Sequence, residues 1–86
     1  MPKRGGDQVA ELSSGRQIKA GRALLGWTQE QLSERASLHK NAVKYWEARE
    51  TIKGQSRDNS ATARMRDALN AAGVRFVDGG AVMEAA

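Results

Sequence analysis

The chain has 86 residues, enough for one small domain. It has no cysteine, which excludes a disulfide framework and a thiolate metal site, and no apolar run near the roughly 20 residues that span a bilayer. Fourteen Lys and Arg against ten Asp and Glu give a net charge of +4, which fits either a solvated surface or a polyanionic partner. We therefore expect a cytoplasmic protein with no membrane partner, and the placement of the charges must decide what it binds.

The N-terminal part of the chain predicts an arm followed by a helix. Residues 1–12 contain Pro2, Gly5 and Gly6, which discourage regular structure, so this segment is expected to be a flexible arm. Ser14 and Gln17 have the spacing of a capping box, which places the start of a first helix there.

The first helix carries a charge on its inner side. Ile18, Arg22 and Leu25 lie on one stripe at i, i+4 and i+7, and Gly26 is suited to end the helix. A charge at Arg22 on an inward stripe requires a partner.

A second helix is expected to begin at Thr28, because Thr28 and Gln31 repeat the capping spacing. The pattern directs Leu32 and Ala36 inward. The expected outward side chains of this helix are Gln29, Glu30, Ser33 and Glu34.

A third helix is expected from His39 or Lys40 to Glu47, after a break at Ser37 and Leu38. Its apolar face is formed by Val43 and Trp46, and a helix this short is stable only when packed against others. The outward residues of the third helix are Lys40, Asn41, Lys44 and Tyr45.

The rest of the chain predicts a loop, a helix and two strands. Residues 48–59 are expected to be a polar loop, and Asn59 or Ser60 should cap a fourth helix that Gly73 ends. Its expected inner residues are Ala61, Met65, Ala68, Leu69 and Ala72.

Residues 74–86 change to a period of two, which predicts a strand or hairpin around an Asp-Gly-Gly turn. A lone hairpin is marginal in water, so the nearest expected partner is the same hairpin of a second copy. The sequence leaves open whether the C-terminal strand pairs within one chain or between two. The candidate dimerisation residues are Val74, Phe76, Val77 and Val82.

Two short helices joined by a tight turn follow the helix-turn-helix plan. The segment TQEQLSERASLHKNAVKYWE, residues 28–47, resembles the Cro/repressor-like (Xre) helix-turn-helix DNA-binding family, with Thr-Gln opening the second helix and Trp-Glu near the end of the third. The resemblance covers about residues 14–72 and implies a mainly α fold: a four- to five-helix lambda-repressor-like DNA-binding domain over residues 13–73, with the C-terminal strand or hairpin after it. The chain has Ser37 where the family usually has glycine, and His39 where Ser or Thr usually caps the recognition helix.

The resemblance makes the third helix the candidate base-reading element. A major groove admits one α-helix, and the N-terminal residues of a recognition helix meet the base edges. Lys40 can donate to guanine O6 and N7, and Asn41 can pair with adenine N6 and N7. Lys44 can reach bases or phosphate, while Tyr45 can contact a thymine methyl group or the backbone. A merely solvated helix face is the alternative.

The resemblance also implies contacts to the DNA backbone and an internal ion pair. The start of the second helix and the loop after the third approach phosphates in this family. The candidate backbone-contacting residues are Thr28, Gln29, His39, Arg49 and Lys53. Arg22 and Glu47 occupy positions that family members commonly join as an ion pair between the first and third helices.

The leading hypothesis is a sequence-specific DNA-binding transcriptional regulator, by default a repressor, that binds a palindromic operator in double-stranded DNA as a homodimer. The alternatives are a protein-interaction module, such as an antitoxin or an anti-activator, and a non-specific nucleoid protein. One histidine, no metal-ligand cluster and no carboxylate pair at a useful spacing indicate that the chain is not an enzyme and uses no metal or cofactor.

Overall fold

The computed structural model describes residues 12–52 and 60–84. In these residues the chain forms four helices and a C-terminal antiparallel hairpin, which confirms the expected mainly α class. The elements are α1 (Gly15–Leu25), α2 (Gln29–Arg35), α3 (Lys40–Glu47), α4 (Ala61–Ala71), β1 (Val74–Val77) and β2 (Gly80–Met83). Lys53 and all but the last residue of the expected N-terminal arm lie outside the described residues.

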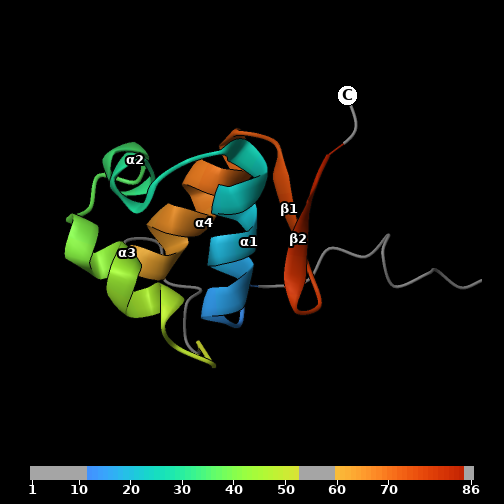
Figure 1. The fold of residues 1–86 in the computed structure, drawn as a ribbon, viewed down its shortest axis with the longest axis horizontal. Coiled ribbons are helices and arrows are strands. Elements are labelled where there is room, and N and C mark those ends of the chain that lie inside the picture. Colours follow the sequence, from blue (N-terminus) through green and yellow to red (C-terminus); the bar gives the residue numbers. More distant parts are fainter. Residues whose placement is uncertain (1–11, 53–59, 85–86) are drawn as a thin grey trace, which may run out of the picture.

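The central element of the fold is α1. The α2–α3 pair lies on one side of it and the hairpin on the other, with α4 packed against all three (Figure 1). The hairpin and α3 are therefore on opposite sides of α1.

No helix in the described ranges combines the length and the apolarity needed to cross a membrane.

Two helices end in the same hydrogen-bonded motif with a left-handed residue. After α1, Gly26 has φ +71°, and Trp27 N donates to Arg22 O at 3.0 Å. After α2, Ser37 has φ +58°, and Leu38 N donates to Ser33 O at 2.8 Å. Both patterns satisfy carbonyls that the helix ends would leave unpaired. Ser37 thus adopts the backbone conformation for which glycine is the usual choice.

The core contains more of the chain than the pattern predicted. The buried apolar residues include Leu12, 1% exposed, and Ile52, 2% exposed. Leu12, the last residue of the expected arm, is therefore part of the core, and the segment expected to be a polar loop contributes Ile52 to the interior. Both residues lie outside helices and strands, so helical periodicity gave no signal for their burial. The buried core cluster is Leu12, Ile18, Leu32, Ala36, Val43, Ile52, Met65, Leu69, Val74 and Phe76.

The prediction that Ser33 points outward was wrong. Ser33 is 3% exposed, and its hydroxyl donates to Glu30 O at 2.6 Å. Because that bond satisfies the hydroxyl within the helix, a small polar residue can occupy the inner face of α2.

The hairpin packs against its own chain, which corrects part of the expected dimer contact. The strands pair Val74 with Met83 and Phe76 with Ala81, and Val74 and Phe76 are 1% and 2% exposed. These two side chains belong to the core over α1, so they are not available to a second copy. Of the four candidate dimerisation residues, Val77 is half-buried and Val82 is 40% exposed.

A buried glutamine joins the hairpin to the start of α1. Gln17 is fully buried, and its Nε2 donates to Val77 O at 2.9 Å. Its Oε1 accepts from the backbone N–H groups of Ser13 at 2.6 Å and Ser14 at 3.0 Å. The expected capping box of α1 is present, and the same side chain anchors the end of β1.

Candidate nucleic-acid interface

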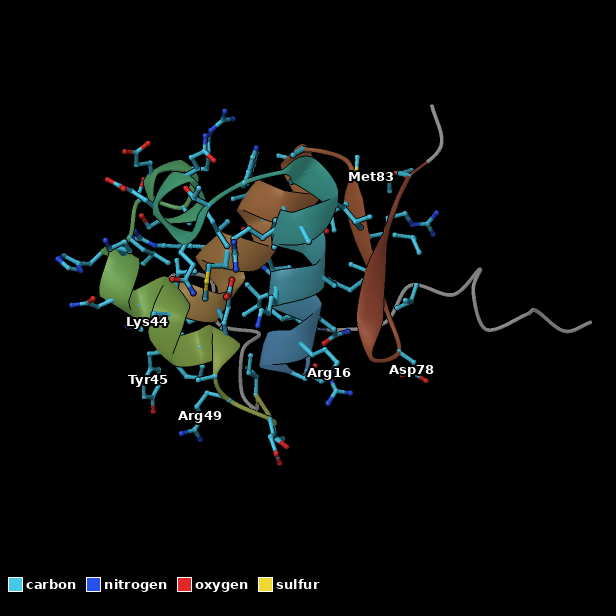
Figure 2. All side chains as sticks on the ribbon, in the orientation of Figure 1. Arg16, Lys44, Tyr45, Arg49, Asp78 and Met83 are labelled. Atoms are coloured by element: carbon cyan, nitrogen blue, oxygen red, sulfur yellow. The ribbon has the colours of Figure 1, made fainter. Side chains whose placement is uncertain are left out.

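The outer face of α3 carries four exposed polar side chains. Lys40, Asn41, Lys44 and Tyr45 are all exposed, and Tyr45 retains 53% of its accessible surface. Lys44 and Tyr45 project from α3 away from the helical body (Figure 2). No hydrogen bond or ion pair within the described residues involves the side chains of Lys40, Asn41 or Lys44. These groups are therefore available to a ligand.

The inner face of α3 fixes the direction in which those residues point. Val43 is fully buried, and Trp46 is half-buried against the core cluster. Because a helix places i and i+3 or i+4 on one face, burial of positions 43 and 46 directs positions 41, 44 and 45 outward. Lys40 lies at the flank of the buried face, in the first turn, and is exposed there. Trp46 is thus a packing residue, as expected, although it is not fully enclosed.

The start of α3 is defined by His39. Its Nδ1 accepts from the backbone N–H of Asn41 at 3.1 Å, which is an N-cap interaction. Histidine thus replaces the more usual Ser or Thr at this position. The first helical residue is Lys40, where the sequence had left His39 or Lys40 open.

The expected ion pair between Arg22 and Glu47 is present and mostly buried. Arg22 Nε and Nη2 donate to the two Glu47 carboxylate oxygens at 2.7 and 3.0 Å, with side-chain exposures of 17% and 5%. Arg22 Nη1 also donates to Trp27 O at 2.9 Å. The bidentate geometry and this third bond satisfy charges that burial would otherwise penalise.

Gln29 belongs to the same network, which the sequence did not predict. Its Nε2 donates to Glu47 Oε1 at 3.0 Å, so the half-buried amide is oriented by α3. The start of α2, the end of α3 and the last turn of α1 are thereby joined at one carboxylate. Gln29 can offer a phosphate oxygen only the side-chain N–H that this network leaves free.

Gly15 allows α1 to approach α3 at backbone distance. A Cβ atom at Gly15 would collide with the carbonyl oxygens of Trp46 and Glu47, and Gly15 N donates to Arg49 O at 2.9 Å. Sequence reasoning missed this role, because a glycine directly after an N-cap carries no local sign of a distant helix. The contact fixes the end of α3 against α1.

The remaining backbone candidates are on the surface. Thr28 is exposed, and its hydroxyl accepts from Gln31 N at 3.0 Å, as the capping pattern predicted. Arg49 Nη1 donates to the Tyr45 hydroxyl at 3.1 Å, and its guanidinium carbon lies 5.5 Å from the centroid of that ring. The i, i+4 spacing of Tyr45 and Arg49 could have indicated this pair.

Comparison of the chain with protein-family models, with curated proteins and with solved structures found no significant match. In the ranges that the structure covers, no group of three or more His, Cys, Asp or Glu side chains could hold a metal ion.

Proposed function

We propose that the protein is a sequence-specific DNA-binding transcriptional regulator, by default a repressor, with a lambda-repressor-like fold of the Cro/repressor-like kind. The observation that carries the proposal is the outer face of α3. It presents two lysines and an asparagine that have no side-chain partner among residues 12–52 and 60–84, on a helix whose other face is packed and whose end is fixed by a buried ion pair. Such a helix can enter a major groove without reorganising.

The roles of the residues follow from their positions on α3. Lys40 and Asn41, in its first turn, would read base edges, while Lys44 and Tyr45 would contact bases or the adjacent backbone. Thr28, Gln29 and His39 lie at the starts of α2 and α3 and would set the register through phosphates. The Arg22–Glu47 pair would hold the two helices in the arrangement that this docking requires.

A homodimer on a palindromic operator remains part of the proposal. Two copies of α3 would occupy successive major grooves about 34 Å apart. Because Val74 and Phe76 belong to the core, the dimer contact would use surface that the hairpin leaves exposed, including Val82.

The experiment is a footprint on the DNA flanking the gene, followed by titration of the protected duplex and of a scrambled duplex. Lys40→Ala and Asn41→Ala should each weaken binding to the protected site by about 1–3 kcal/mol and relax base preference there. Glu34→Ala, on the exposed side of α2, is the control and should change neither affinity by more than about twofold.

Three results would separate the alternatives. Equal affinity for any duplex would indicate a non-specific nucleoid protein. An absence of salt-dependent DNA binding would indicate a protein-interaction module such as an antitoxin or anti-activator, because phosphate contacts make DNA affinity fall steeply with salt. An unchanged operator affinity in both α3 variants would remove α3 as the reading element.

A further inference from the structure

Three positive side chains outside the candidate base-reading face lie around one hollow. Arg16 and Lys19 from α1 and Arg49 from the end of α3 line an open surface depression of about 830 Å³, which Thr51 and Gly79 also border. All three cations are exposed. We call Arg16, Lys19 and Arg49 the α1–α3 basic patch.

The packing of α1 explains why these residues meet. Lys19 is one turn beyond Gly15, on the side of α1 that approaches the end of α3. Arg49 is the second residue after that end, and its carbonyl accepts from Gly15 N. The close helix contact therefore brings Lys19 beside Arg49, although they are thirty residues apart in the chain.

The charge balance at the hollow is positive. Glu47 lines it, but its carboxylate is already paired with Arg22. Glu50 is the other acidic residue of the lining, and its carboxylate has no ion pair in the described residues. The hollow therefore has three positive charges against one unpaired negative charge.

The patch continues the outer face of α3. Arg49, which belongs to the patch, donates to the hydroxyl of Tyr45, which belongs to the outer face of α3. This hydrogen bond joins the two surfaces. Lys44, Tyr45, Arg49 and Arg16 follow one another along the same margin of the molecule (Figure 2). A duplex that met Tyr45 would thus extend its backbone toward the hollow.

We propose that the α1–α3 basic patch is a second backbone-binding site, which holds the phosphates of the DNA strand beyond the bases that α3 reads. Lys19 and Arg49 are its principal contacts, and Arg16 is its third cation. The inference rests on the proposed function and adds α1 to the DNA surface. It predicts that the patch contributes affinity without contributing base preference.

The test is titration of the full chain against the footprinted duplex and a scrambled duplex at several salt concentrations. Lys19→Ala should weaken both by the same factor, about three- to tenfold, and lower the slope of log affinity against log salt by about 0.9. Glu50→Gln should act in the opposite direction and strengthen both. Circular dichroism would establish that the variants fold.

Arg75→Ala is the matched control, because Arg75 carries the same charge on β1, on the opposite side of α1 from α3. It should leave the slope of log affinity against log salt unchanged. An effect equal to that of Lys19→Ala would overturn the inference, because the loss of affinity would then depend only on the net charge of the protein. The inference also fails if Lys19→Ala and Arg49→Ala change nothing while Lys40→Ala weakens the operator complex; the proposed function then stands. If wild-type protein shows no salt-dependent DNA binding, the proposed function itself fails.

Discussion

Arg22 and Glu47 place opposite charges inside the packing surface between α1 and α3. The pair is stable because each polar atom is satisfied: Arg22 reaches both carboxylate oxygens and Trp27 O, and Glu47 also accepts from Gln29. The buried pair fixes α1 relative to α3. Removing one partner is costly, because the remaining charged group would stay desolvated with no ion-pair partner.

Removing one partner should therefore destabilise the protein strongly. Arg22→Met and Glu47→Leu are each expected to lower the free energy of unfolding by about 2–4 kcal/mol, and the double variant should lose less than the sum. The measurement is urea denaturation followed by circular dichroism. Arg66→Ala removes an exposed pair with Asp67 and should cost less than about 1 kcal/mol. Equal losses at Arg22 and Arg66 would contradict the burial argument.

Ser37 and Gly26 occupy equivalent left-handed positions with different residues. Ser37→Gly should raise the free energy of unfolding by about 0.5–1 kcal/mol, because glycine adopts φ +58° without steric cost. Gly26→Ser should lower it by a similar amount, since a Cβ there meets no atom within 4 Å and only the backbone conformation is strained. Thermal melting of both variants checks the pair, and a stability loss in Ser37→Gly would show that the serine side chain has another role.

The crossing of α1 and α3 depends on one missing side chain. The methyl group of an alanine at Gly15 would meet backbone oxygens of Trp46 and Glu47, which cannot rotate away as a side chain could. The two helices would have to separate, which would disturb the adjacent ion pair.

Gly15→Ala is expected to lower the free energy of unfolding by about 3 kcal/mol or more, the upper range for overpacking. Gly80→Ala is the control, because a Cβ there meets open space and its backbone conformation is ordinary; it should be nearly neutral. Chemical denaturation of both variants is the measurement. A neutral Gly15→Ala would mean that α1 and α3 do not approach as closely as described.

The whole molecule is one core to which the hairpin belongs. Val74 and Phe76 pack in the same cluster as residues from α1 and α4, and Gln17 holds the end of β1 from inside. The hairpin is therefore part of the support for α3, although it lies on the far side of α1 (Figure 1).

Phe76→Ala should lower the free energy of unfolding by about 3–5 kcal/mol through the cavity that it leaves. Val82→Ala, on the exposed strand of the hairpin, should stay within about 0.5 kcal/mol. Denaturation and light scattering would be measured on the same samples. If the wild type is a dimer and the Phe76→Ala protein is a fully stable monomer, Phe76 contacts the second copy and its burial in the core is contradicted.

Features that depend on near neighbours in the chain could be predicted from the amino-acid sequence alone. Cap spacings at Ser14 and Thr28, the apolar period of α3 and the Asp-Gly-Gly turn act within a few residues, so the starts of α1 and α2, the outward set on α3 and the hairpin were predictable. The Arg22–Glu47 pair was anticipated from an unpaired inward charge together with the family resemblance.

Features that depend on residues far apart in the chain could be seen only once the chain was folded. Leu12 and Ile52 enter the core from irregular segments. Phe76 is buried against α1 of the same chain, and Gln29 is oriented by its hydrogen bond to Glu47. The role of Gly15 and the α1–α3 basic patch both arise from the contact between α1 and α3, which are far apart in the sequence. Local pattern fixes which side of an element is apolar, but the partner that covers that side depends on how the whole chain closes around one core.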